Sequence, residues 1–424
     1  MALKDFREEA ERCSRCSLCK WVPMDQVKGY DFSYACPSIS RFNFHSYSAG
    51  GRLNIALSMM DGRIDYTDDL LEIIYKCQLC GACDVACKYT RDMEPLETIR
   101  ALRSQCVEDG QVIPEHMAII ESLKKDDNIM ERPKADRGKW AEGLAVKDIT
   151  REKAEVVYHA GCRYSYDEQL WGAARGAVNI LKQAGVDLGI AGKAEACCGG
   201  RVYDLGYKGE LTKYADNNME LFRGAGVKTL VTSCADGYFT FKVLYEKFGK
   251  KDGLEVLHIT EYLAKLLKEG KLKLTKKVPM TVTYHDPCHL GRMGEPFKHW
   301  QGQLKRDLTM PVLYEPPKEF MRGTYGVYEP PRDVIKSIPG MKLVEMGRIK
   351  EYSWCCGSAG GVKETYPDFA IWTALERIRE AKSTGAEAIV TACPWCKNNF
   401  TDEIKESGDK IKVYDVVEII QQAI

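Results

Sequence analysis

The sequence predicts an α+β multidomain chain in which a small helical domain precedes two duplicated α/β domains. Three observations give this prediction. The 424 residues are 45% hydrophobic and 29% charged, which is ordinary for globular protein and leaves room for two or three domains. Short helical patterns separated by cysteine-rich turns fill the N-terminal part. Beyond them, short apolar runs alternate with amphipathic stretches, and one set of landmarks occurs twice.

Charge and cysteine content narrow the class of function. Lysine plus arginine and aspartate plus glutamate each number 61, so no net field attracts nucleic acid or an anionic membrane. No apolar run reaches the roughly 18 residues of a membrane span, and the charged N-terminus lacks the apolar core of a secretory signal. The 18 cysteines are too many to be incidental core residues. We expect a cytoplasmic protein, at most peripheral to a membrane through a partner subunit, whose thiols serve metal or redox chemistry.

The helical domain is expected over residues 1–123. A helix is predicted at 67–76, where Thr67 is suited to cap the N-terminus, and another at 95–107, which has proline in its first turn. The polar stretch over 124–153 is expected to be a linker.

The two α/β domains are expected over residues 154–275 and 276–424. Four landmarks recur in one order, at 158–162 and 284–288, 197–200 and 355–358, 230–234 and 389–393, and 258–262 and 414–418. Chance does not produce four ordered matches, so we infer an internal duplication.

The spacing of the N-terminal cysteines is the sharpest functional signal. One run is Cys77-x2-Cys80-x2-Cys83-x3-Cys87, and the other is Cys13-x2-Cys16-x2-Cys19 followed by Cys36-Pro37. Three thiolates at two-residue gaps let a tight turn wrap one cubane iron–sulfur cluster while the fourth ligand comes from elsewhere. Zinc also takes four thiolates, but the usual zinc ribbons space them more widely.

These runs resemble those of bacterial two-cluster ferredoxins, although Lys88 stands where that family has proline after the fourth cysteine. In that family the fourth cysteine of each run serves the other cluster. The resemblance therefore implies two [4Fe-4S] clusters with crossed ligand sets, Cys13, Cys16 and Cys19 with Cys87, and Cys77, Cys80 and Cys83 with Cys36.

The last domain carries a second constellation, which consists of Cys288, Cys355, Cys356, Cys393 and Cys396. It resembles the cysteine-rich CCG domains of heterodisulfide reductase catalytic subunits, which also occur in the iron–sulfur subunits of glycolate and lactate oxidases. The order of a two-cluster ferredoxin module and two CCG domains extends the resemblance over nearly the whole chain. It implies a noncubane [4Fe-4S] cluster held by these five cysteines.

The first α/β domain departs from that pattern. It offers Cys162, Cys197, Cys198 and Cys234, but Gly237 stands where the fifth cysteine belongs. A conventional [4Fe-4S] cluster, zinc, an incomplete noncubane cluster and an empty thiol site all remain open there, and Asp236 or solvent is a substitute for the missing thiolate.

Two further features lie near the last constellation. An insertion at about 300–327 repeats the motif Tyr-Glu-Pro-Pro, and either covers a site, docks a partner or is a solvated loop. His285 and His289 flank Cys288, where they either move protons or donate hydrogen bonds to sulfur.

The resemblance implies an iron–sulfur oxidoreductase subunit that passes electrons through two cubane clusters to a noncubane cluster and reduces a disulfide there. The alternative is a relay without its own substrate, in a 2-hydroxyacid oxidase or aromatic acyl-CoA reductase type of complex; a zinc-thiolate scaffold or redox sensor is a third hypothesis. The sequence has no convincing nucleotide-binding motif. The expected electron partners are therefore a flavoprotein, a ferredoxin or a membrane cytochrome.

Overall fold

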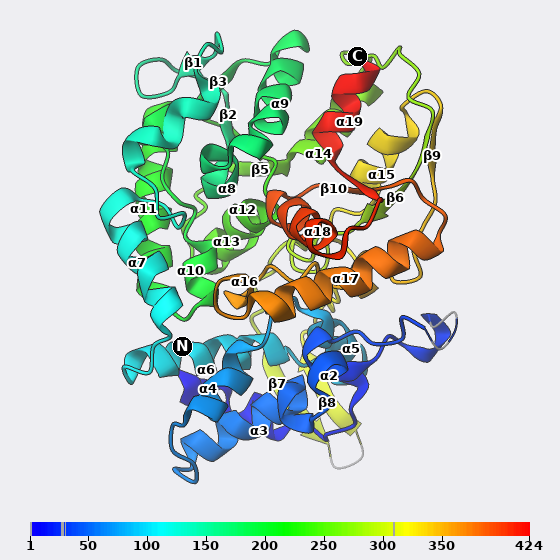
Figure 1. The fold of residues 1–424 in the computed structure, drawn as a ribbon. Coiled ribbons are helices and arrows are strands. Elements are labelled where there is room, and N and C mark those ends of the chain that lie inside the picture. Colours follow the sequence, from blue (N-terminus) through cyan, green and yellow to red (C-terminus); the bar gives the residue numbers. More distant parts are fainter. Residues whose placement is uncertain (1, 27–28, 30, 308–309) are drawn as a thin grey trace.

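The computed structural model describes residues 2–26, 29, 31–307 and 310–424, so residues 308 and 309 of the expected insertion lie outside the described residues. A helical N-terminal domain lies at the bottom of Figure 1, and two α/β domains lie side by side above it. Each α/β domain is built on its own parallel sheet. The α+β multidomain prediction is confirmed.

The N-terminal domain consists of short helices joined by loops, and its cysteines lie both in the loops and in the helices. Its helices are α1 (Arg7–Glu11), α2 (Pro37–Phe42), α3 (Ala49–Met60), α4 (Asp68–Tyr75), α5 (Ala82–Arg91), α6 (Pro95–Glu108) and α7 (Pro114–Asp126). Helix α4 begins directly after Thr67, whose hydroxyl accepts a hydrogen bond from the Leu70 N–H at 3.1 Å. Both predicted helices are therefore present, and the predicted cap is confirmed.

The first α/β domain has a five-stranded sheet of order β1-β3-β2-β4-β5, with all neighbours parallel. Its strands are β1 (Lys147–Asp148), β2 (Val156–His159), β3 (Leu188–Ile190), β4 (Thr229–Thr232) and β5 (Glu255–His258). Its helices are α8 (Gly161–Tyr166), α9 (Trp171–Gln183), α10 (Gly200–Asp204), α11 (Lys208–Gly224), α12 (Ala235–Phe239), α13 (Tyr245–Lys247) and α14 (Ile259–Lys268).

The second α/β domain repeats this topology. Its sheet has the order β11-β10-β6-β9, with strands β6 (Met280–His285), β9 (Met341–Leu343), β10 (Ala388–Thr391) and β11 (Lys412–Asp415). Its helices are α15 (Glu329–Lys336), α16 (Val362–Thr365), α17 (Pro367–Ser383), α18 (Pro394–Ser407) and α19 (Val416–Ala423). Along the chain, β6, β9, β10 and β11 correspond to β2, β3, β4 and β5. Across the sheet, the order β9-β6-β10-β11 repeats the order β3-β2-β4-β5. The topology is therefore that of a duplication.

The two α/β domains pack closely on each other. A methyl group at Gly176 of α9 would lie 2.4 Å from the Gln421 side chain of α19, so glycine permits this approach. The Tyr164 hydroxyl, just beyond β2, donates to Asp415 at the end of β11 at 2.6 Å. The carboxyl ends of the two sheets therefore meet, which is where ligands bind in parallel sheets.

The polar segment 124–153 packs onto the first α/β domain. A 3-10 helix spans Lys134–Ala141, and β1 pairs with β3 at the edge of the sheet. Arg137 and Trp140 are fully buried. Arg137, a charged residue of this polar segment, therefore lies in the protein interior.

The insertion forms a β-hairpin of β7 (Gln303–Asp307) and β8 (Met310–Glu315). The hairpin lies beside the N-terminal domain in Figure 1. The hydroxyl of Tyr314 donates to Asp92 at the end of α5, and Lys318 pairs with the same carboxylate at 3.2 Å. The insertion therefore joins the second α/β domain to the N-terminal domain.

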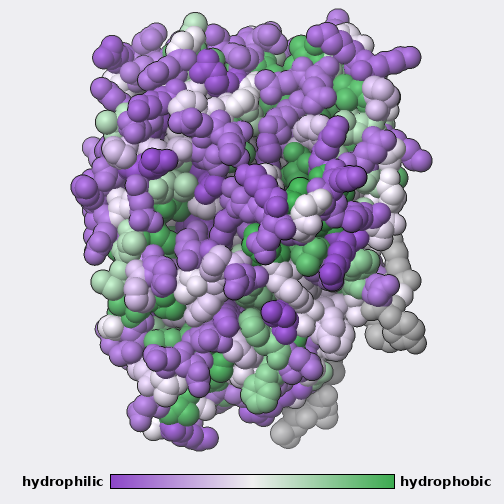
Figure 2. All heavy atoms as spheres, viewed as in Figure 1, coloured by the Kyte–Doolittle hydropathy of each residue, from purple (hydrophilic) through white to green (hydrophobic). Residues whose placement is uncertain are grey.

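The surface is consistent with a globular chain. Figure 2 shows a mainly hydrophilic face on which apolar residues form small, separate patches. None of the helices in the described ranges is long and apolar enough to cross a membrane.

Candidate iron–sulfur centres

Four N-terminal cysteines surround one small cavity. The loop before α5 supplies Cys77 and Cys80, the first turn of α5 supplies Cys83, and Cys36 directly precedes α2; all four line the cavity. Gly81 ends this loop with φ +73°, directly before α5. Burial raises the pKa of the Cys36 thiol to about 12. This thiol therefore becomes a thiolate ligand only beside a positive centre such as a metal ion.

The other N-terminal cysteines gather around Cys87. Burial raises the pKa of Cys87 most, and the neighbouring Cys19, Cys13 and Cys16 raise it further. Cys19 interacts with the backbone N–H groups of Ala49 and Gly50 at the start of α3, and Cys16 is exposed. The fourth cysteine of each run thus lies with the first three of the other run, and one of the two groups reaches the surface.

The five cysteines of the second α/β domain form a continuous series of contacts. Cys288 and Cys393 follow β6 and β10, Cys355 and Cys356 lie in the loop before α16, and Cys396 lies in the first turn of α18; all five are buried. The contacts run from Cys288 to Cys355, Cys356, Cys396 and Cys393 in turn. Gly357 has φ +99°, and its N–H lies 3.3 Å from the Cys355 sulfur. A tight glycine turn therefore lets adjacent cysteines face one interior space.

Cys80 connects the N-terminal domain to this series. Its side chain packs in one buried cluster with Cys288 and Cys355, which are far away in the sequence. Arg292 secures the junction, since its Nε donates to the Cys80 carbonyl at 2.6 Å and its Nη1 to the Ser353 carbonyl at 2.6 Å. The two cysteine groups are thus neighbours.

The cysteines of the first α/β domain divide between two places. Cys162, Cys197 and Cys198 contact one another in that order. Cys234 instead contacts Cys393 of the second α/β domain. Sequence reasoning grouped all four, but Cys234 follows β4, whose carboxyl end faces the other sheet.

A buried cation accompanies the first three of these cysteines. Arg137 Nη1 lies 3.6 Å from the Cys162 sulfur, and its Nη2 donates to Glu195 at 2.9 Å. The Glu195 carboxylate also accepts from the Ala160 and Gly161 N–H groups at 3.0 and 2.9 Å. Sequence reasoning missed this pair, because a charged residue in a polar stretch looks solvent-exposed.

His289 lies between the two α/β domains. Its Nδ1 lies 3.6 Å from the Cys288 sulfur and 3.1 Å from Asp236, and its Nε2 lies 3.6 Å from Asp204. Burial alone would lower the pKa of His289, but the nearby carboxylates, Asp236 foremost, hold it well above its ordinary value. Asp236 is thus a charged partner of the second domain's histidine.

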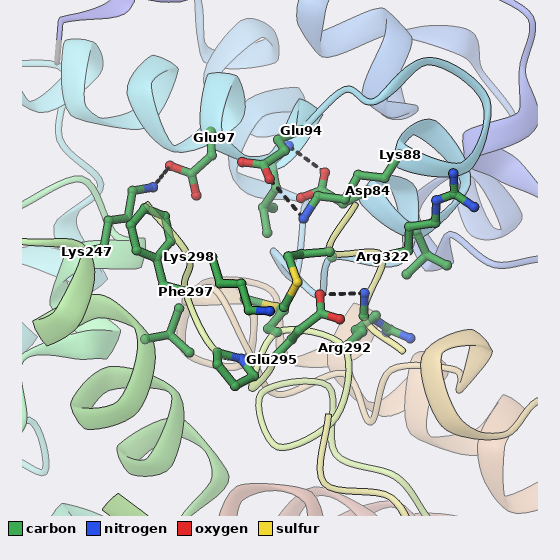
Figure 3. Close-up of a pocket in the computed structure, with 18 of the residues that line it drawn as sticks. Asp84, Lys88, Glu94, Glu97, Lys247, Arg292, Glu295, Phe297, Lys298 and Arg322 are labelled. Carbon is green, nitrogen blue, oxygen red and sulfur yellow. Dashed lines mark hydrogen bonds and ion pairs between the residues drawn. The ribbon is translucent and has the colours of Figure 1, made fainter. Parts of the chain in front are cut away.

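A cavity of about 420 Å³ adjoins the junction between the N-terminal and second α/β domains. Its lining includes Gly81 and Asp84 near the N-terminal cysteines and Arg292 and Met293 near Cys288. Ion pairs on its wall join Lys88 with Glu94 and Lys247 with Glu97, while Lys298 and Arg322 come from the insertion and its flank (Figure 3). Burial raises the pKa of Asp84 to about 7. The cavity is therefore lined by many charged side chains and lies beside residues next to both cysteine groups, although no cysteine is among the described residues that line it.

The donor sets fit iron–sulfur chemistry. Cysteine thiolates are the usual ligands of iron–sulfur clusters, and the cavity among Cys36, Cys77, Cys80 and Cys83 is lined by one complete set of four. The second α/β domain offers one more thiol than a cubane needs.

Comparison with protein families agrees. The model of a 4Fe-4S dicluster domain matches residues 9–90, and the model of a cysteine-rich CCG domain matches 156–242 and 317–401. The dihydromethanophenazine:CoB–CoM heterodisulfide reductase of Methanosarcina mazei has a subunit that is 30% identical over 98% of this chain and 94% of its own length. The chain belongs to this family of heterodisulfide reductase subunits.

More distant members are known from bacteria. The EtfAB:quinone oxidoreductase of Syntrophomonas wolfei is 28% identical over 83% of this chain and 46% of its own length. The probable iron–sulfur-binding oxidoreductase FadF of Bacillus subtilis is 29% identical over 89% and 50%. The resemblance predicted from the cysteines is thus confirmed, and the chain is an iron–sulfur oxidoreductase subunit.

Proposed function

We propose that this subunit carries electrons through two cubane [4Fe-4S] clusters to a five-cysteine noncubane cluster at which a disulfide is reduced. Cys13, Cys16, Cys19 and Cys87 would hold one cubane, and Cys77, Cys80, Cys83 and Cys36 the other. Cys288, Cys355, Cys356, Cys393 and Cys396 would hold the noncubane cluster.

The contact between Cys80 and Cys355 carries this proposal, because it makes the second cubane set adjacent to the five-cysteine set. The clusters, when bound, would supply one electron at a time, and two electrons with two protons convert one disulfide into two thiols. Arg292 would hold the two loops in register, and the adjoining cavity would admit the substrate.

The composition of the anaerobically purified protein tests the first part. Two cubanes and one four-iron noncubane cluster predict about twelve irons per chain, with matching sulfide. A further iron–sulfur cluster or zinc at Cys162, Cys197 and Cys198 would add about four irons or one zinc, which Cys162→Ser would remove. About eight irons and no additional cluster would contradict the proposal.

The site of disulfide reduction is tested with Cys396→Ser and a reduced viologen as electron donor. We expect loss of disulfide reduction with unchanged paramagnetic signals from the two cubanes. Cys106→Ala is the control, because Cys106 is buried in the core of the N-terminal domain away from the proposed sets. Activity that survives Cys396→Ser would contradict the assignment.

One observation favours the relay alternative, in which the chain has no substrate of its own. The five cysteines of the second α/β domain, which we call the second set, are each no more than 7% exposed, as suits a sealed conductor. The relatives' names include a quinone oxidoreductase, and a flavoprotein, a ferredoxin or a membrane cytochrome would be the partner. A reduced protein that reduces an acceptor protein or quinone, but no disulfide, would favour the relay.

A further inference from the structure

His285 lies at the carboxyl end of β6, inside the second α/β domain. The residue is 1% exposed, and its ring packs edge-on against Phe400 with centroids 4.9 Å apart. One of its ring nitrogens and the sulfur atoms of Cys356 and Cys396 all lie within 4.8 Å of one another. Such a group suits either a metal-bound histidine or a histidine that donates a hydrogen bond to sulfur.

Arg377 decides between these roles. Its Nε lies 3.1 Å from Nδ1 of His285 and can only donate a hydrogen bond. Nδ1 must therefore be the acceptor, its single lone pair is used, and the ring proton resides on Nε2. A histidine bound to metal through Nε2 would carry its proton on Nδ1, directly against the Arg377 N–H.

Arg377 cannot easily turn away. It is fully buried, and its Nη1 donates to Glu380 at 2.6 Å and to the Arg348 carbonyl at 2.8 Å. Its Nη2 donates to the Ser353 hydroxyl at 3.1 Å. The guanidinium is thus fixed on three sides, and the tautomer of His285 is fixed with it.

The Nε2 group of His285 has no hydrogen-bond partner among the described residues. A buried N–H without an acceptor is unfavourable, because the group has lost its hydrogen bonds to water. Of the two sulfur atoms beside His285, that of Cys356 interacts with the ring, and it becomes a good acceptor when the thiolate is ionised by a bound metal.

We propose that His285 is a neutral hydrogen-bond donor to the Cys356 thiolate, not a metal ligand, and that Arg377 holds it in this role. His285 is thus a positioning residue that tunes the redox group of the second set. The inference rests on the proposed function, since it requires an iron–sulfur group there. An N–H donated to a ligand sulfur stabilises the reduced, more negative state and raises the reduction potential.

The duplication supplies a matched control. His159 occupies the equivalent place at the end of β2, but its Nε2 faces the Ala196 carbonyl at 3.2 Å instead of a cysteine of the second set. Substituting His159 removes a buried histidine of the same kind without changing the hydrogen bonds of Cys356.

The experiment is a redox titration of the full chain, purified without oxygen and followed by electron paramagnetic resonance. His285→Leu is expected to keep its iron and to lower the potential of the second-set signal by about 59 mV, which corresponds to a tenfold shift for a one-electron couple. His285→Gln, which keeps an N–H donor, should lie close to the wild type, and His159→Leu should leave this potential unchanged.

Nitrogen hyperfine spectroscopy of the wild type gives a second readout that needs no variant to fold. We expect only the weak coupling of a hydrogen-bonded nitrogen. Strong coupling of a directly bound nitrogen, or loss of iron from the second set in His285→Leu, would overturn the inference. An unshifted potential with full iron would also overturn it, whereas a wild type without a second-set signal would instead refute the proposed function.

Discussion

Replacement of Arg103 by lysine should loosen the connection among all three domains. This arginine of α6 is fully buried, and its two terminal nitrogens donate to five backbone carbonyls. The acceptors are Ile74, Tyr75 and Cys77 in the N-terminal domain, Asp204 in the first α/β domain and Gly360 in the second.

The magnitude follows from the number of bonds that a lysine cannot make. The two shortest, to the carbonyls of Cys77 and Gly360, are both 2.7 Å and approach from different domains. An ammonium group has three protons and no planar fork, so Arg103→Lys loses at least two of the five bonds. At about 1.5–3 kcal/mol for each bond to a charged group, the expected loss of unfolding free energy is about 3–6 kcal/mol.

Urea titrations under anaerobic conditions, followed by tryptophan fluorescence and by cluster absorbance, measure this loss. Arg63→Lys is the matched control, because the Arg63 side chain is 73% exposed and makes a surface ion pair with Asp61; it should change stability by less than about 0.5 kcal/mol. We also expect slower electron transfer between the N-terminal and second α/β domains in Arg103→Lys. A loss below about 1 kcal/mol would refute the view that Arg103 joins the three domains.

Two further predictions concern a buried acid and a glycine turn. Burial raises the pKa of Asp415 to about 6, so the folded state keeps this proton up to a higher pH than the unfolded state does. Its contribution to the unfolding free energy should therefore fall by about 0.8 kcal/mol from about pH 5.5 to about pH 7.5. Asp415→Asn, whose amide oxygen still accepts from Tyr164, should lack this part of the slope in paired urea titrations. Gly357→Ala should lose second-set iron but not N-terminal iron, because its methyl group would lie 2.3 Å from the Ala370 carbonyl; Gly209→Ala, with open space around it, is the control, and full iron in Gly357→Ala would contradict the expectation.

Local patterns in the sequence were sufficient for the helices and the duplication. Thr67 caps α4 because a hydroxyl next to the first turn accepts from its N–H groups. The apolar runs of the two α/β domains form buried parallel strands in the same order, as continuous apolar runs between amphipathic helices predict.

The arrangement of the cysteine groups was not readable from the sequence. The contacts of Cys80 with Cys355 and of Cys234 with Cys393 join residues that are distant in the chain, and spacing motifs describe only neighbours. The role of Arg137 was hidden because hydrophobic patterns assign charged residues to the surface, whereas here the Glu195 carboxylate compensates the buried charge beside the Cys162 sulfur.

The absence of a fifth cysteine from the first α/β domain is not imposed by the backbone. The nearest atoms to a Cβ at Gly237 would be Thr232 Oγ1 at 3.4 Å and Cys234 Cβ at 3.6 Å, which are tolerable contacts, and no positive φ requires glycine there. The residues just before it face the other domain, with Cys234 against Cys393 and Asp236 against His289. The first domain therefore lacks a ligand that its fold could hold, while its remaining motif forms part of the surroundings of the second domain's cysteines. The duplicated domains are thus alike in topology but unlike in chemistry, and this asymmetry fits a single redox centre at the meeting point of their sheets.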